Sequence, residues 1–280
     1  MATEIAIFKL KDGKAPEDST SAAGQVFKDT LNTLTEQKGF QRAYWGTETE
    51  NPENFRLFVD WDSVDAHTDF TKTETYKPFL ERFGMMADLS SAQMFHVPFT
   101  PHPPTEALSD HVSPTSEINV HYFSSDFSDH DGFLEAYKQV VAGAEKTAKA
   151  QTASAGGWTQ EKDIPIPGTS EKGQAYVGII GWNSMEAHEE WESSGDRDKA
   201  LQKYKDQIKH ESVTHSSLTQ VQKGAGGVGD VDGGNVQEEI LNPLDGGKSA
   251  PKTKADGTTT KNNDDLKGAA NSLKKERAGR

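Results

Sequence analysis

Cysteine is absent from all 280 residues of the sequence. A disulfide framework, a cysteine-based zinc site and a thiol nucleophile are therefore excluded, and the composition suits a reducing compartment. Basic residues are scarce, because 30 Lys and Arg stand against 44 Asp and Glu and give a net charge of −14. An acidic surface repels phosphates and anionic lipid, so we expect neither nucleic acid nor a membrane as a partner.

Long apolar runs are also missing. No stretch approaches the roughly 20 apolar residues that a membrane span needs. The N-terminal Met-Ala-Thr-Glu-Ile has no basic region and no apolar core of a secretory signal. These absences predict a soluble, cytoplasmic protein.

Aromatic residues are absent from residues 223–280, which hold ten Lys or Arg and nine Asp or Glu. This segment is rich in glycine and has few large apolar side chains. It cannot bury enough apolar surface to offset the entropy of ordering its chain. We predict a disordered tail, with a segment that docks on a partner as the alternative.

An internal repeat is the strongest positive feature. Residues 61–67 (Trp-Asp-Ser-Val-Asp-Ala-His) recur as residues 182–188 (Trp-Asn-Ser-Met-Glu-Ala-His), and residues 4–7 (Glu-Ile-Ala-Ile) match residues 117–120 (Glu-Ile-Asn-Val). Matching blocks in the same order, separated by small shifts, imply one structural unit used twice. The predicted boundaries are a first module at 1–98, a proline-rich extended linker at 99–115, a second module at 116–222 and the tail at 223–280.

Each copy has the pattern β-α-β-β-α-β, the order of the ferredoxin-like split βαβ fold. The first copy predicts strands at 4–10, 40–49, 54–61 and 91–98, with helices at 17–37 and from Ser63 toward Phe83. The second copy predicts strands at 117–124, 157–162, 174–182 and 213–221, with helices at 128–150 and after Ser184.

Both faces of the predicted strands at 5–8 and 55–59 are apolar, apart from Arg56. One face packs on the module's own helices, so the other needs a second cover. The obvious cover is the other copy. We therefore predict an α+β fold in which two tandem ferredoxin-like (βαββαβ) modules form an intramolecular α/β-barrel, a monomer with an internal pseudo-dimer.

A strand that ends in Trp, followed by Ser-x-x-Ala-His at the start of a helix, resembles the dimeric α/β-barrel superfamily. More specifically, it is similar to antibiotic-biosynthesis-monooxygenase-like (ABM) domains, including fused two-domain forms, over about residues 1–222. The resemblance implies activities that range from cofactor-independent quinone-forming and anthrone monooxygenases to haem-degrading enzymes, polyketide cyclases and decarboxylases. Haem-degrading relatives place a histidine ligand further along the second helix, where residues 71–76 and 196–200 hold none. We expect no cofactor.

His67 and His188 are the candidate catalytic residues, because they occupy the same place in the two copies. Each lies three residues before an aromatic residue, Phe70 or Trp191, on the same side of its helix, which turns the imidazole toward the sheet. Histidine has an ordinary pKa near 6.5 and can act as a general base. The alternative is a structural histidine that fastens the helix to the sheet through a local hydrogen bond.

Four aromatic residues are candidates for substrate binding. Trp61 and Trp182 end the central strands, where a flat indole can stack on a polycyclic ligand, or can close the core between strand and helix. Tyr76 and Tyr176 are candidate pocket walls. Gly178 stands where the first copy has leucine, so we expect more free volume, and ligand binding, in the second module.

Two further histidines complete the candidate substrate-binding set. His96 aligns with Gln220 and His121 with Phe8, so each appears in one copy only. Unshared polar residues on apolar strands mark a single working pocket, or simply strand residues with one exposed edge. No His, Asp and Glu cluster has helical or hairpin metal spacing, so no metal site is expected.

Three functions remain open at this stage. The first is a cofactor-independent monooxygenase, or a related enzyme, that acts on an aromatic or polyketide-like small molecule. The second is a non-catalytic small-molecule binder or stress-associated barrel, and the third is an interaction module whose tail recruits a partner. Buried polar groups that converge on an open cavity would favour the first function, and a filled interior would favour the third.

Overall fold

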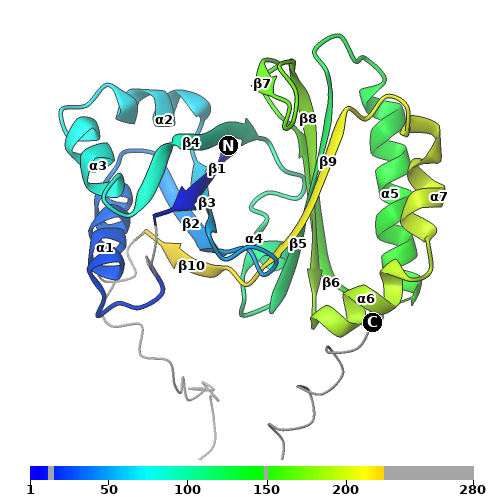
Figure 1. Ribbon diagram of the computed structural model, residues 1–280, viewed down its shortest axis with the longest axis horizontal. Coiled ribbons are helices and arrows are strands. Elements are labelled where there is room, and N and C mark those ends of the chain that lie inside the picture. Colours follow the sequence, from blue (N-terminus) through cyan, green and yellow to red (C-terminus); the bar gives the residue numbers. More distant parts are fainter. Residues whose placement is uncertain (12–15, 148–150, 224–280) are drawn as a thin grey trace, which may run out of the picture. The chain divides into compact units, whose positions relative to one another are not determined.

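Two antiparallel sheets organise the chain, and each carries its helices on one face (Figure 1). The computed structural model describes residues 1–11, 16–147 and 151–223, which all belong to one compact unit, Met1–Asp232. The tail predicted after residue 222 lies outside the described residues, apart from Lys223. None of the helices in the described ranges is long and apolar enough to cross a membrane.

The first sheet has the strand order β10-β2-β3-β1-β4. The elements of the first module are β1 (Ala2–Leu10), α1 (Ala22–Thr35), β2 (Phe40–Thr47), β3 (Asn54–Trp61), α2 (Val64–Thr71), α3 (Tyr76–Phe83) and β4 (Ala87–Val97). The helix predicted from Ser63 is two helices, because the chain turns between α2 and α3. Ser63 caps α2 as predicted, since its side chain accepts a hydrogen bond from the backbone N–H of Ala66.

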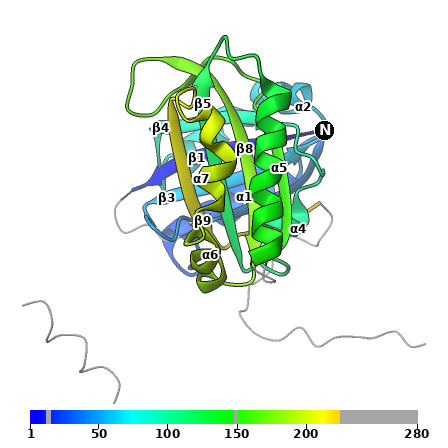
Figure 2. The ribbon, with the colours of Figure 1, turned by 90° about the vertical axis from the view of Figure 1, so that its right-hand side faces the viewer.

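The second sheet has the order β6-β8-β5-β9, with the short β7 paired to β8. After α4 (Thr105–Leu108), the second module and the strand after it comprise β5 (Thr115–Ser124), α5 (His130–Thr147), β6 (Gln151–Trp158), β7 (Ile164–Pro165), β8 (Lys172–Trp182), α6 (Met185–Glu192), α7 (Asp196–Leu201), the 3-10 turn η1 (Gln202–Tyr204), β9 (His210–Ser216) and β10 (Thr219–Gln222). Figure 2 shows α5 and α7 lying over the outer face of this sheet.

The two sheets share one apolar core, which explains why both faces of the central strands are apolar. Ile5 and Phe58 of the first sheet pack in one cluster with Ile118 and Val177 of the second. The opposite face of the first sheet packs against its own helices in a separate cluster. The predicted α+β architecture of two ferredoxin-like sheets packed face to face, with helices outside, is confirmed.

The segment that follows each module pairs with the sheet of the other module. Strand β10 follows the second module but pairs with β2, where Thr219 faces Trp45. Thr100, just after the first module, forms a bridge with Gly156 of β6 through hydrogen bonds of 2.9 and 3.1 Å. The single strand predicted at 213–221 is therefore two strands in different sheets. The predicted extended linker at 99–115 contains α4 and packs into the shared core.

Strand β6 also differs from its predicted place at 157–162, because its sequence does not look like a buried strand. It is made of small and polar residues, Gln-Thr-Ala-Ser-Ala-Gly-Gly before Trp158. A Cβ atom on Gly156 would lie 2.1 Å from the hydroxyl of Tyr176, and one on Gly157 would lie 2.8 Å from the side chain of Val97. Tertiary contacts, not strand propensity, select glycine at both positions.

Candidate functional site

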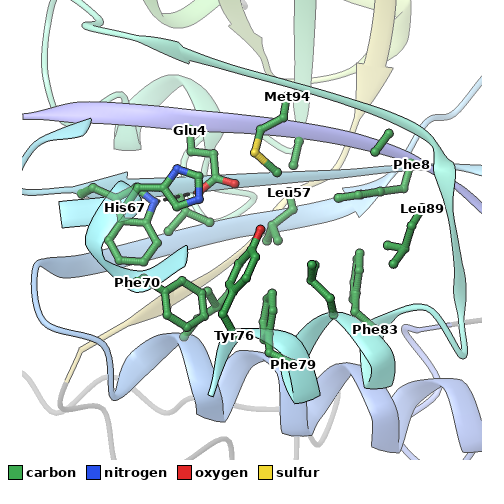
Figure 3. Close-up of a pocket in the computed structure, with 16 residues that line it drawn as sticks. Glu4, Phe8, Leu57, His67, Phe70, Tyr76, Phe79, Phe83, Leu89 and Met94 are labelled. Carbon is green, nitrogen blue, oxygen red and sulfur yellow. Dashed lines mark hydrogen bonds and ion pairs between the residues drawn. The ribbon is translucent and has the colours of Figure 1, made fainter. Parts of the chain in front are cut away.

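An apolar cavity of about 230 Å³ lies in the first module between the sheet and the helices α2 and α3 (Figure 3). Leu57 and Val59 line it from the sheet, and the rings of Phe70 and Phe83 line it from the helices. Met94 also lines it from the edge strand β4 and is 41% exposed. The cavity therefore has its opening along this edge.

Four polar or aromatic side chains meet at one end of the cavity (Figure 3). The indole N–H of Trp61 donates a hydrogen bond of 2.8 Å to Oε2 of Glu4. Nε2 of His67 lies 3.5 Å from the same oxygen, and its ring stacks on Trp61 at 5.4 Å between centroids. The hydroxyl of Tyr76 points into the cavity (Figure 3). A buried carboxylate, an imidazole and a phenol thus face one apolar space.

A second histidine and a second carboxylate continue this cluster toward the other module. Nδ1 of His67 lies 2.8 Å from Nε2 of His96. Glu161, from the second module, accepts hydrogen bonds from Nδ1 of His96 at 2.6 Å and from its backbone N–H at 2.8 Å. An ionised carboxylate can only accept hydrogen bonds, so Nδ1 of a neutral His96 carries the proton and Nε2 carries the lone pair. His67 therefore donates its Nδ1–H to Nε2 of His96. The lone pair of a neutral His67 is then on Nε2.

The environment favours the neutral form of His67. Burial lowers its pKa most strongly, and the nearby His96 lowers it further, while Glu4 raises it. The net shift of the pKa is downward, as desolvation of a histidine requires. Burial raises the pKa of Tyr76, with a smaller contribution from Glu4 in the same direction. At neutral pH the site therefore combines a base that is free of its proton with a phenol that keeps its own.

The second module repeats this cluster around Glu117. Nε1 of Trp182 donates a 2.8 Å hydrogen bond to Oε2 of Glu117, and Nε2 of His188 lies 3.5 Å from that oxygen. The ring centroids of His188 and His215 are 4.2 Å apart. Nδ1 of His215 makes a short contact with Glu50 of the first module. The two clusters thus mirror each other, and each has one carboxylate from the opposite module.

The interior of the second module is filled where the first has its cavity. Tyr137 from α5 packs against β8, and a Cβ atom on Gly178 would lie 2.1 Å from its ring. Its hydroxyl accepts a 3.2 Å hydrogen bond from Asn119, and Tyr137 is 3% exposed. The expectation of free space beside Gly178 is wrong, because the tyrosine occupies the volume that the missing side chain leaves.

The structure brings only part of the predicted set together. His67, Trp61 and Tyr76 line the cavity, and His96 lies directly behind His67. The other predicted residues belong to the core of the second module. These are His188, Trp182, Tyr176 and His121.

His121 is fully buried and does not mark a pocket. Its Nε2 lies 2.8 Å from a carboxylate oxygen of Glu211, which also contacts Arg197. The rings of Phe133 and Tyr137 pack against its imidazole. This contact set makes His121 part of a polar network with Glu211 and Arg197 and not a residue on an exposed strand edge.

The predicted alignment of His96 with Gln220 is wrong. His96 faces Glu4 across the strand pair β1 and β4, and His215 faces Glu117 across β5 and β9. His96 therefore corresponds to His215 and is present in both copies. The alignment failed because Gln220 belongs to β10, which pairs with β2 in the first sheet, and not to the last strand of the second sheet.

Neither buried carboxylate was predicted as a site residue, although the sequence contains a signal for both. Glu4 and Glu117 begin the matched blocks of the repeat, and each is a charged residue at the start of an apolar strand in both copies. A charged residue in that position needs a partner, which here is the indole N–H of the tryptophan. Glu50 and Glu161 lie in loops, and nothing in their local sequence distinguishes them.

Part of the first module matches a known protein family. Residues 6–82, from β1 into α3, match the model of the antibiotic biosynthesis monooxygenase (ABM) family. The chain carries an ABM domain. The matched residues include His67, Trp61 and Tyr76, whereas Glu4, Phe83 and Met94 line the cavity from outside the matched range. No curated protein matches the sequence significantly.

Solved structures share the two-sheet fold. An anthrone oxidase-like protein superposes with a TM-score of 0.57 at 13% identity, over 80% of this chain and 93% of that one. A candidate monooxygenase from Fusobacterium nucleatum subsp. nucleatum gives a TM-score of 0.50 at 10% identity, over 80% and 94% of the two chains. At such low sequence identity, these similarities concern the fold alone. Both of these proteins share it over nearly the full length of one chain.

Proposed function

We propose that the first module is a cofactor-independent monooxygenase for small phenols of one or two rings, with His67 as the general base. The observation that carries this proposal is the position of His67 at the polar end of an otherwise apolar cavity. Its Nδ1 is engaged by His96, which leaves the Nε2 lone pair for a substrate proton. The ABM match over the same residues supports this assignment.

The size of the cavity limits the substrate. About 230 Å³ is below the usual range of roughly 300–1,000 Å³ for sites that hold drug-sized ligands. Aromatic walls at Phe70, Phe79 and Phe83 favour a flat ring system. A bicyclic phenol such as 1-naphthol suits this space better than a tetracyclic polyketide.

The chemistry can proceed with dioxygen as the only co-substrate. His67 removes the hydroxyl proton of 1-naphthol, and the electron-rich naphtholate transfers electrons to dioxygen and forms a C–O bond at its para carbon. The peroxide takes up a proton. Loss of the para C–H proton then breaks the O–O bond, so that 1-naphthol and dioxygen give 1,4-naphthoquinone and water.

The residues around His67 support each proton movement. The imidazolium that forms has its Nε2–H beside Oε2 of Glu4, whose carboxylate stabilises the positive charge. The Tyr76 hydroxyl can donate a hydrogen bond to the naphtholate oxygen. The hydrogen bonds from His67 to His96 and from His96 to Glu161 provide a path toward a carboxylate that is 30% exposed.

The test is oxygen uptake by the full chain with 1-naphthol and other one-ring and two-ring phenols. We expect one dioxygen consumed per quinone formed, with one labelled oxygen atom in the product when ¹⁸O₂ is used. Replacement of His67 by Ala should lower the rate by about 10²-fold or more, the usual contribution of a general base. The exposed His111 gives a control variant, His111→Ala, that should keep the full rate.

Binding of the phenols without any oxygen uptake would contradict the catalytic proposal and support a binding protein instead. A His67→Ala variant with unchanged turnover per folded molecule would remove His67 as the base. Circular dichroism of each variant separates loss of chemistry from loss of fold.

A further inference from the structure

The second module contains two imidazoles and a carboxylate that the proposed catalysis does not use. Glu117 comes from β5, His188 from α6 and His215 from β9, and one ligand atom of each lies within 4.8 Å of the other two. Their exposed fractions are 0%, 3% and 5%. Two histidines and one carboxylate are a donor set that suits Zn²⁺ and other divalent transition-metal ions.

Two nitrogen atoms of this cluster are left without partners. Among the residues that the structure describes, neither Nδ1 of His188 nor Nε2 of His215 has a hydrogen-bond partner, although both are buried. The corresponding atoms in the first module, Nδ1 of His67 and Nε2 of His96, bond to each other at 2.8 Å. A buried polar atom without a partner costs free energy, and a cation held between the two nitrogens would recover it.

The surrounding residues orient the three side chains as ligands. Glu50 of the first module contacts Nδ1 of His215 and accepts a 3.0 Å hydrogen bond from its backbone N–H. His215 therefore donates through Nδ1 and has its lone pair on the buried Nε2. A carboxylate that receives the second N–H of a histidine is the usual outer shell of a metal ligand.

Glu117 lies 3.5 Å from the other imidazole nitrogen of His188, Nε2, and hydrogen bonds hold its carboxylate in place. Its Oε2 accepts a hydrogen bond of 2.8 Å from Trp182, and its Oε1 accepts one of 2.9 Å from the side-chain amide of Asn119. Glu192 and Arg197 are the other charged groups that influence His188 besides its neighbour His215. The two carboxylates Glu117 and Glu192 outnumber the one guanidinium near His188, so the local negative charge favours a cation.

From these contacts we infer that Glu117, His188 and His215 form a binding site for one divalent transition-metal ion, with Zn²⁺ as the probe. Glu4, His67 and His96 of the first module lie equally close together, but Nδ1 of His67 and Nε2 of His96 already hydrogen-bond to each other, so we assign the metal to the second module. The inference does not depend on oxygenation in the first module, since it concerns a different set of residues.

The test measures zinc retained by the full chain without an affinity tag. The protein is stripped with a chelator, incubated with Zn²⁺, passed through gel filtration and assayed by mass spectrometry. We expect one zinc ion per chain in the wild type and in His96→Ala, the matched variant of the first module. Glu117→Gln and His215→Ala should retain none.

Variants at the buried positions can lose zinc simply because they do not fold, so a second pair of variants changes more exposed residues. Glu50 and Glu161 are 44% and 30% exposed in their side chains, so Glu50→Gln and Glu161→Gln should both fold. Glu50→Gln should weaken zinc affinity by about 10–100-fold, the usual effect of an outer-shell change, while Glu161→Gln should leave it unchanged.

Three results would overturn the inference. The first is a wild type that retains no zinc. The second is equal zinc affinity in Glu50→Gln and Glu161→Gln. The third is retention of two ions with one lost in His96→Ala, which would mean that the first module binds metal as well.

Discussion

The two modules share one fold but differ in what fills the space between sheet and helices. The pair Ala6 and Leu57 in the first sheet corresponds to Asn119 and Gly178 in the second. In the first module this wall borders a cavity. In the second, Tyr137 lies against the glycine and bonds to the asparagine. Asn119 and Gly178 in place of Ala6 and Leu57, with Tyr137 packed against them, thus accompany the change from an open pocket to a packed core.

The difference extends to the histidine clusters. Both modules have a tryptophan, a glutamate and two histidines in equivalent places, and both receive a carboxylate from the opposite module. The histidines hydrogen-bond to each other only in the first module, among the described residues. Repetition of the cluster therefore does not imply repetition of its function. Shared architecture preserves the residues, and small changes in packing decide which atoms are free.

The largest expected effect is the loss of Tyr137. Replacement of this buried side chain by Ala should lower the free energy of unfolding by about 3–5 kcal/mol, the usual cost of an aromatic deletion in a core. Tyr76→Ala in the first module should cost about 1 kcal/mol, since that side chain is only partly buried and borders empty space. Urea unfolding of both variants gives the comparison. Equal costs would show that the two interiors are packed alike.

A smaller effect is expected from adding a methyl group at Gly178. The new Cβ would lie 2.1 Å from the buried ring of Tyr137, and overpacking of this kind costs about 1–3 kcal/mol. Gly178→Ala should therefore lower the thermal midpoint. In the double variant with Tyr137→Ala, the added methyl group should cost much less, because the ring is gone. Additive costs would mean that the tyrosine does not fill this space in solution.

Acid should affect the second module more than the first. Burial lowers the pKa of the buried His121 and His188 in the second module and of the buried His67 in the first. The pKa of His102 in the linker, near Asp60 of the first module, shifts in the same direction, but this side chain is only half-buried. The unfolded chain therefore binds protons near pH 6.5 that the folded chain does not. The free energy of unfolding should fall as pH drops below about 6.5, at up to about 1.4 kcal/mol per pH unit for each histidine.

The carboxylates change stability in the same direction at lower pH. Burial alone would raise the pKa of Glu50 and Glu161, but hydrogen bonds from His215 and His96 outweigh it and leave both below their ordinary values. Hydrogen exchange at pH 7 and pH 5 can compare the two sheets. We expect protection to fall more in β5 and β8 than in β1 and β3, and the reverse order would contradict this reading of the buried histidines.

The sequence predicted the fold well because the repeat and the strand pattern both depend on local residues. Two apolar faces on the strand at 55–59 were enough to predict a second sheet as cover. The crossing of β10 was not predictable from local pattern, because its pairing partner β2 lies more than 170 residues earlier in the chain. The same holds for β6, whose glycines are selected by side chains from other strands.

Only those residues of the candidate site that belong to a motif within one module could be predicted from the sequence. His67 and Trp61 stand in a recognisable motif, and Tyr76 follows nearby. The role of Glu161 depends on a contact between modules, which no spacing within one copy reveals. The assignment of free space to the second module failed because a missing side chain at Gly178 was read without the residue that replaces it, Tyr137. Volume is a property of the packed structure and not of one position.

Binding of 1-naphthol in the absence of oxygen tests most directly the claim that the first module holds the ligand site. Calorimetry on the wild type should detect one site per chain. Leu57→Trp fills the cavity and should weaken binding by more than about tenfold, or at least 1.4 kcal/mol, while Tyr176→Phe in the second module should leave it unchanged. Unchanged binding in Leu57→Trp, or its loss in Tyr176→Phe, would contradict the account.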